Sequence, residues 1–246
     1  MIWLYRLLFL PLFLLLMPRY IVRMVRRGGY GRDFHHRFGR VPERAAREAA
    51  CIWVQAVSVG EVQAIEPLVR RRLESGYAVI LTTTTSTGYQ LALARLGGDC
   101  LVAVFPLDFW LFSRRAWARF RPDAVVLMES EVWPEHIHQA RKHGAPVFLL
   151  NARLSDRSFR RYRTVRPVAK AIFRRIDKIL ASSPADAERF RELGVPDSKL
   201  LTTGNLKFDT PVEPVLSEQA CKELRAELGF DAGPDAAEPL VILGSS

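Results

Sequence analysis

The carboxylate of Glu61 stands where a strand pattern gives way to a helix pattern, in "VSVGE". The apolar run that ends at Val59 predicts a buried strand, and the residues after Gly60 have helical spacing. One interpretation is a helix-start acid, which the helix dipole stabilises by about 0.3–1 kcal/mol. The other is a general base whose pKa is tuned by a partly buried cleft.

Two more carboxylates and one ammonium follow strand patterns further along the chain. Glu129 and Glu131 come directly after the apolar "AVVLM", and Lys207 follows a turn at Gly204. The apolar setting predicts that at least one of the two acids is buried and paired. A lysine at a strand end can bind a phosphate or a carboxylate, although an ordinary surface lysine gives the same pattern.

Polar side chains and glycines at the same strand ends are expected to bind the substrate. "TTTTSTG" offers hydroxyls and backbone amides to a polar ligand, and Asn151 and Arg153 lie in "NARLSDRS". Asn151 can instead hold a turn, and Arg153 can pair with a cleft acid. The residues expected to bind the substrate are Ser58, Gly60, Thr87, Gly88, Glu131, Asn151 and Arg153.

Several other kinds of site are disfavoured by spacing. The threonine-rich segment is not a G-x-x-x-x-G-K-[ST] phosphate loop. The histidine and cysteine spacings match no zinc motif, so we expect no metal. Ser58 lacks the G-x-S-x-G context of a nucleophile.

The elements that must position these residues alternate along the chain from Cys51. Seven short apolar patterns, rich in Val, Ile and Leu, alternate with helical patterns, and a basic helical stretch covers 160–176. Strands that are apolar on both faces and separated by helices predict an α/β fold with a mostly parallel, doubly wound sheet. Ligands of such sheets bind beyond the carboxyl ends of the strands, where all the residues named above are expected to gather.

The amino-terminal segment predicts a membrane anchor. Leu7 to Met17 carries no charged or polar side chain and is followed by arginines. A signal peptide has its charges before the apolar run and a small-residue cleavage site after it, whereas here the arginines mostly follow the run and no A-x-A pattern appears. A buried core helix is the remaining alternative. The positive-inside rule places the rest of the chain on the cytoplasmic side.

Charge and cysteine content agree with this interpretation. The 246 residues carry a formal charge of +10, and residues 1–40 hold eight arginines and one acid. A basic segment beside an apolar run favours anionic lipid over nucleic acid as the partner. The three cysteines are far apart, which indicates a reducing compartment.

Four regions are expected along the chain. Residues 1–26 are the anchor, and 27–209 form the α/β domain. Residues 210–239, with prolines around one helix near 216–228, form a linker. The strand pattern "PLVILGSS" indicates that 240–246 begin a second α/β domain whose remainder is missing from this chain.

Five stretches in order resemble one family: "AVSVGE", "TTTSTG", "MESEVWP", "NARLSDRS" and "TGNLKFD". They are similar to those of the 3-deoxy-D-manno-octulosonic acid (Kdo) transferases, which are membrane-anchored, two-domain GT-B glycosyltransferases of lipopolysaccharide synthesis. The resemblance runs from the anchor to the last residue. Gln55 stands where the family often has a histidine.

The resemblance implies a GT-B-type amino-terminal Rossmann-like domain that binds the acceptor. It implies transfer of Kdo from CMP-Kdo to a lipid A precursor (lipid IVA), with inversion and without a cofactor or metal. Glu61 matches the general base, and Glu129 and Lys207 match positions that stabilise the transition state. It also implies attachment to the cytoplasmic side of the inner membrane, with anionic lipid as a partner.

Two alternatives are kept. One is another membrane-associated GT-B glycosyltransferase that acts on a different lipid acceptor. The other is a non-catalytic glycolipid-binding remnant without the donor domain.

Overall fold

The structure is a computed structural model that describes residues 2–26, 31–44, 49–208 and 218–227. The chain divides into two compact units, Met1–Thr210 and Pro211–Ser246. In the second unit, the predicted linker helix is present as α9 (Glu218–Glu227). The predicted strand over 240–246 lies outside the described residues, and the four-region division stays a prediction.

The first unit is built on one parallel sheet, as predicted. Its seven strands have the order β3-β2-β1-β4-β5-β6-β7, and each neighbouring pair is parallel. The strands are β1 (Cys51–Gln55), β2 (Ala78–Thr83), β3 (Leu101–Val104), β4 (Ala124–Met128), β5 (Val147–Ala152), β6 (Lys178–Ala181) and β7 (Leu200–Thr202).

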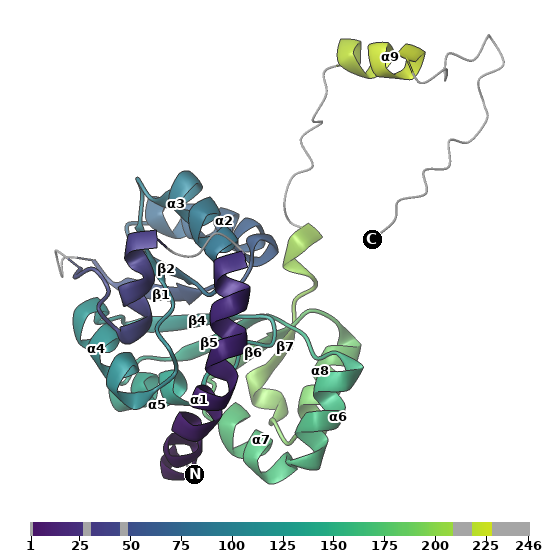
Figure 1. Ribbon diagram of the computed structural model, residues 1–246. Helices are drawn as coiled ribbons and strands as arrows, with labels where there is room; N and C mark the ends of the chain where they lie inside the picture. Colours follow the sequence, from purple (N-terminus) through teal and green to yellow (C-terminus); the bar gives the residue numbers. More distant parts are fainter. Residues whose placement is uncertain (1, 27–30, 45–48, 209–217, 228–246) are drawn as a thin grey trace. The chain divides into compact units, whose positions relative to one another are not determined.

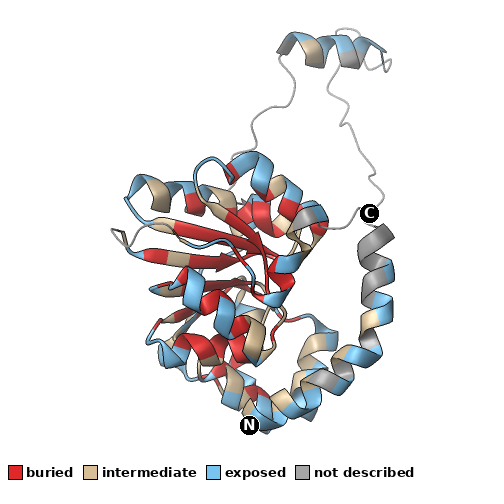
Figure 2. Cartoon of the chain, turned by 60° about the vertical axis from the view of Figure 1, so that its left-hand side comes forward, coloured by how far each residue is buried: buried red, intermediate tan, exposed pale blue. Residues whose placement is uncertain are grey.

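Helices cover both faces of this sheet (Figures 1 and 2). One face packs against α2 (Val59–Glu74) and α3 (Ser86–Leu96), with Ile65 and Leu81 in its core. The other face packs against α4 (Trp110–Phe120), α5 (Pro134–Lys142), α6 (Asp156–Thr164), α7 (Arg166–Phe173) and α8 (Pro184–Glu192). Short 3-10 helices complete the unit: η1 (Gly31–Phe38), η2 (Asp197–Lys199) and η3 (Leu206–Phe208).

The core of the second face is aromatic. Trp53 of β1 is fully buried and lies within 6 Å of the rings of Trp117 and Phe120. Its indole N–H donates to Thr82 Oγ1 at 2.8 Å, so the one polar atom of the ring has a partner. Such large buried rings fix the helices against the sheet and hence fix the strand ends that carry the site.

The amino-terminal segment forms one long helix, α1 (Ile2–Arg26), as its apolar pattern predicts. Among the described residues, no helix combines the length and the apolarity that crossing a membrane requires. The first turns of α1 contact the α/β domain, because Phe9 stacks on Phe109 with ring centroids 5.4 Å apart.

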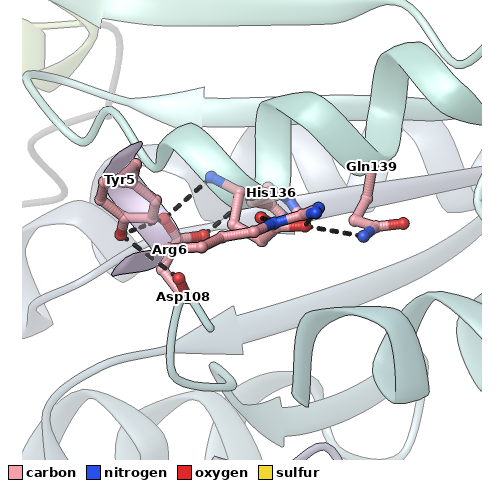
Figure 3. A network of polar contacts seen from close by, with 6 residues as sticks. Tyr5, Arg6, Asp108, His136 and Gln139 are labelled. Carbon is pink, nitrogen blue, oxygen red and sulfur yellow. Dashed lines mark hydrogen bonds and ion pairs between the residues drawn. The ribbon is translucent and has the colours of Figure 1, made fainter. Parts of the chain in front are cut away.

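Two polar side chains of α1 fasten it to the domain (Figure 3). Tyr5 donates to Asp108 Oδ2 at 2.7 Å. Arg6 donates to both carboxylate oxygens of Glu135, at 2.8 and 2.9 Å. The Glu135 side chain is fully buried and that of Arg6 is 16 % exposed. Arg6 is therefore committed to the protein rather than to a membrane interface.

Asp108 joins α1 to the start of α5. Its two carboxylate oxygens accept from the backbone N–H groups of Glu135 and His136, at 3.0 and 2.8 Å. Burial raises the pKa of Asp108 to about 6, against hydrogen bonds from Tyr5 and the two amides that favour the charged form. Asp108 therefore holds the start of α5 in place.

We predict that Arg6→Met lowers the free energy of unfolding by about 3 kcal/mol, because it leaves the Glu135 carboxylate buried without its cation. Chemical denaturation measures this. Arg19→Met is the matched control, since Arg19 is exposed on the same helix, and it should change stability by less than about 0.5 kcal/mol. Equal effects of the two substitutions would show that the pair does not hold α1.

Candidate functional site

Glu61 is held at the junction between β1 and α2 by three hydrogen bonds. Its Oε2 accepts from the backbone N–H of Val57 at 2.9 Å, and its Oε1 accepts from the Ser58 hydroxyl at 3.0 Å. The Ser58 oxygen in turn accepts from the Glu61 N–H at 3.4 Å. Ser-x-x-Glu with these contacts is a variant of the capping box, in which the glutamate accepts from Val57, the residue before the N-cap Ser58, and it explains why α2 starts here.

The same carboxylate is almost enclosed by protein. Glu61 is 6 % exposed, and this burial raises its pKa, assisted by the negative charge of Glu129 and opposed by the hydrogen bonds from Val57 and Ser58. A carboxylate with a raised pKa is a better proton acceptor than an ordinary surface glutamate. The geometry thus supports both predicted roles of Glu61, the helix-start acid and the base.

Glu129 follows β4 in a backbone conformation that non-glycine residues rarely adopt. Its φ is +54°, and its N–H donates to the carbonyl of Leu150 on β5 at 2.9 Å. Strained φ angles outside glycine concentrate at functional sites. Glu129 Oε1 lies 3.2 Å from Lys207 Nζ, so the predicted acid and the predicted cation meet.

Asn151 at the end of β5 has the same left-handed conformation, with φ +52°. Its Oδ1 accepts from the backbone N–H of Leu206 at 3.2 Å, and Leu206 packs against the α2 side of the core. The loop that carries Lys207 is therefore tied to the neighbouring strand end. Asn151 is 3 % exposed, and its Nδ2 has no partner among the described residues, so a donor remains for a ligand.

Glu131 lies two residues after Glu129, at the end of a turn in which its N–H donates to the Met128 carbonyl at 3.0 Å. Burial, assisted by the negative charges of Glu61 and Glu129, raises its pKa to about 7. Near neutral pH this carboxylate therefore exchanges a proton readily, whereas an isolated glutamate would be fully ionised.

These groups form one electrostatic cluster drawn from separate elements. The pKa of Glu61 responds, after burial, to the charges of Glu129 and Lys207, and that of Glu131 to Glu61 and Glu129. The ammonium of Lys207 thus acts on Glu61 and Glu129, and Glu131 meets only the charges of these two carboxylates. Such a cluster can accept a proton from a hydroxyl and stabilise positive charge that develops on a sugar ring.

The two glycines predicted for the site, Gly60 and Gly88, have different surroundings. Gly88 is buried, and a Cβ there would lie 2.9 Å from Thr85 Oγ1 and 3.3 Å from the Ser58 carbonyl carbon. It permits α3 to begin against the end of β1, where Thr85 donates to the Val57 carbonyl at 2.9 Å. A Cβ on Gly60 would meet no atom within 4 Å, so this position faces open space.

Thr87 and Arg153 are exposed. Thr87 lies in the first turn of α3, beside Gly88. The Arg153 backbone N–H donates to the Glu129 carbonyl at 3.4 Å, while its side chain has no ion pair among the described residues. Both side chains are accessible to a ligand at this edge.

Tyr162 of α6 is a neighbour of the cluster that its sequence position gave no reason to expect. Burial raises the pKa of its hydroxyl, and the negative charge of Glu131 raises it further. Its ring packs edge-on against Phe173 of α7. The sequence signal was only an aromatic residue in a basic helix, whereas in the structure Tyr162 is close enough to Glu131 for the carboxylate charge to act on its hydroxyl.

One group of potential metal ligands occurs within the described ranges, on η1. Ligand atoms of Asp33, His35 and His36 lie within 4.8 Å of one another. The Tyr89 hydroxyl donates to Asp33 at 2.8 Å, and the Val104 N–H donates to His36 Nδ1 at 3.3 Å. These contacts hold η1 against α3 and β3, which is a structural role, and we assign no step of a reaction to the group.

Comparisons with known proteins agree on one family. Residues 32–210 match the family model described as 3-deoxy-D-manno-octulosonic-acid transferase. The chain is 36 % identical over 216 residues to the 3-deoxy-D-manno-octulosonic acid transferase of Bordetella pertussis, covering 85 % of this chain and 48 % of the relative. The Chlamydia pneumoniae transferase is 30 % identical over 237 residues, covering 95 % and 53 %. The chain thus spans about half the length of the curated relatives it matches.

Solved structures give the fold. The Anabaena protein HepE, in complex with UDP and glucose, matches with a TM-score of 0.51 at 14 % identity, covering 73 % of this chain and 50 % of that one. The UDP-GlcNAc 2-epimerase of Neisseria meningitidis matches with a TM-score of 0.50 at 13 % identity, covering 73 % and 54 %. The first unit therefore has the α/β fold of the GT-B glycosyltransferases, as the sequence predicted.

We predict that Glu131→Gln changes how stability depends on pH. The folded pKa of about 7 exceeds the usual 4.5, so Glu131 favours folding below pH 4.5, and this contribution is lost as the pH rises through 7. The variant should therefore gain stability relative to the parent chain between pH 5 and pH 8. Urea denaturation at several pH values measures this.

The same substitution at Glu74, exposed at the far end of α2, controls for the loss of one negative charge. If the parent chain and Glu131→Gln have parallel profiles over this range, Glu131 is not part of the carboxylate cluster.

Proposed function

Because the chain belongs to the 3-deoxy-D-manno-octulosonic acid (Kdo) transferase family, we propose that it forms the acceptor-binding domain of a glycosyltransferase. The reaction we propose moves Kdo from CMP-Kdo to a lipid A precursor (lipid IVA), with inversion at the transferred sugar. The acceptor hydroxyl attacks the anomeric carbon, the bond to the CMP oxygen breaks, and the hydroxyl proton passes to a base. No covalent enzyme intermediate and no cofactor is needed.

The observation that carries this proposal is the raised pKa of Glu61 within a cluster that also contains Glu129 and Lys207. A general base needs a pKa close to the working pH and a position at the substrate. Burial raises the pKa of Glu61 above its usual value, in the direction a base needs, and the open space beside Gly60 leaves room for a hydroxyl next to the carboxylate. The capping contacts use one lone pair on each Glu61 oxygen. The remaining lone pairs are left to accept a hydrogen bond from the attacking hydroxyl of the acceptor sugar.

Glu129 and Lys207 suit the charges of the transition state. The sugar ring gains positive character as the bond to CMP breaks, and a carboxylate such as Glu129 stabilises it. The Lys207 side chain is 44 % exposed, so its ammonium can reach the carboxylate of Kdo or the departing phosphate. Their ion pair holds both groups before the substrates arrive.

The acceptor sugar is proposed to bind along the strand ends beside Glu61. The unpartnered Nδ2 of Asn151 can donate to a hydroxyl or phosphate oxygen, and the exposed Arg153 can pair with a phosphate. Ser58, Gly60, Thr87, Gly88 and Glu131 complete the proposed contacts.

We further propose that α1 attaches the chain to the cytoplasmic face of the inner membrane. Seven of its apolar side chains are exposed although Tyr5 and Arg6 fix the helix to the domain: Trp3, Leu4, Leu7, Leu8, Leu14, Leu15 and Val22. The excess of arginines over residues 1–40 matches anionic lipid. Attachment would bring the domain to its lipid acceptor.

The base role is tested with Glu61→Gln in the chain extended by the uncovered half of the Bordetella pertussis relative. Glutamine can keep the capping box, because a Gln oxygen still accepts from Val57 or Ser58. It cannot take the acceptor proton. We therefore predict that turnover falls by on the order of 100-fold or more, while stability falls by less than about 1 kcal/mol.

Turnover is measured as transfer to lipid IVA by mass spectrometry, and stability is measured by chemical denaturation. Glu74→Gln, the same substitution at the other end of α2, should keep turnover. An acceptor whose hydroxyl is already acidic should partly rescue Glu61→Gln alone. Near-normal turnover of Glu61→Gln would reduce Glu61 to a capping residue and overturn the proposed mechanism.

A further inference from the structure

The α6–α7 segment is the most basic part of the α/β domain. Residues 156–175 contain eight arginines and lysines and one acid, Asp156. Asp156 is itself ion-paired with Arg189 of α8. The basic side chains of this segment therefore have no acid of their own to neutralise them.

The turn between the two helices presents both charge and apolar surface. Val165 and Val168 are 48 % and 47 % exposed. Around them Arg160, Arg161 and Arg166 are exposed, and none has an ion pair within the described ranges. The inner side of the segment is different, since Phe159, Tyr162, Ile172 and Phe173 pack on the core.

This turn belongs to the side of the domain that carries α1 and the carboxylate cluster. Tyr162 on α6 lies close enough to Glu131 for the carboxylate charge to raise its pKa. The pKa of His138 on α5 is lowered mainly by burial and also by the charges of Arg6 on α1 and Arg175 after α7. The start of α1 therefore lies beside α5 (Figure 1), and Arg175, just after α7, is close enough to α5 for its charge to act on His138.

We propose that the α6–α7 turn is a second membrane-contacting surface, which binds the headgroups of an anionic bilayer while Val165 and Val168 enter the interface. The inference rests on the proposed function, because a lipid acceptor must reach the carboxylates from a bilayer. Arginines around exposed valines match a surface that is anionic outside and apolar beneath.

A bilayer fits this turn better than a nucleic acid does. Single strands are bound by exposed aromatic rings, and here Phe159 and Tyr162 are packed inward. The two exposed valines at the centre of the basic surface have no counterpart in a phosphate backbone. With α1, the turn would give two points of contact and so fix how the domain faces the membrane.

The first measurement is partitioning of the full chain onto vesicles. One set is phosphatidylcholine, and the other is an equimolar mixture of phosphatidylcholine and phosphatidylglycerol. Each basic residue near an anionic surface strengthens partitioning about five-fold. The Arg161→Gln, Arg166→Gln double variant should therefore bind the anionic vesicles about 25-fold more weakly.

The matched control is the Arg71→Gln, Arg115→Gln double variant. It removes the same charge from exposed residues of α2 and α4, outside the α6–α7 segment, and should bind nearly as the parent chain does. An equal loss for both pairs means that only net charge matters, which overturns the proposal.

The second measurement reports whether the α6–α7 turn itself enters the membrane, and it does not depend on how strongly α1 binds. An environment-sensitive fluorophore is attached to Val168→Cys in a Cys100→Ser, Cys221→Ser background, leaving the buried Cys51. Its emission should shift to shorter wavelength on anionic vesicles, whereas the same label on Arg71→Cys should not shift. No shift at residue 168, or a shift produced only by a DNA duplex, overturns the proposal.

Failure here is distinguishable from failure of the proposed function. If the label at residue 168 does not respond but the extended chain transfers Kdo to lipid IVA in detergent micelles, only the second membrane contact is wrong. If transfer is absent while the label responds, the second membrane contact is supported and the proposed reaction is wrong.

Discussion

All seven strands of the sheet run in one direction, and the rest of the site depends on this constraint. Parallel strands end at one edge, so residues that follow them meet although they are up to 146 positions apart in the sequence, as Glu61 and Lys207 are. Glu129 follows the strand next to β1, and its ion pair with Lys207 spans from β4 to the loop after β7. Helices on both faces of the sheet keep water from the strands and leave this edge open.

Glu61 shows how one side chain can serve both folding and chemistry. Its hydrogen bonds to Val57 and Ser58 start α2 and also fix the direction in which the carboxylate points. A base that is held in place does not lose conformational entropy when the acceptor binds. Asn151 has a comparable double role, since one end of its amide holds the Lys207 loop and the other is left without a partner among the described residues.

The sequence predicted the strands and the helices because the alternation of apolar patterns is a local property of the chain. It also predicted the meeting of Glu61, Glu129 and Lys207, because residues that follow parallel strands gather at one edge of the sheet. It did not predict the partners of Arg6 and Asp108, which come from α5 and depend on how α1 packs. The basic stretch expected as one helix is two, interrupted at Val165, whose ψ of +36° departs from helical geometry. Nor could spacing reveal the left-handed backbone of Glu129 and Asn151, since that conformation is imposed by neighbouring strand ends.

The central claim is that the carboxylate cluster is the acceptor site and that Glu61 is its proton acceptor. The most direct test is carbon-13 NMR of the glutamate carboxylates in this chain, with the Glu61 signal assigned by its loss in Glu61→Gln, titrated with and without lipid A precursor in micelles. The account predicts that Glu61 titrates above the usual 4.5 and that its signal moves when the acceptor is added. A Glu61 signal that titrates at the ordinary value and ignores the acceptor would contradict it.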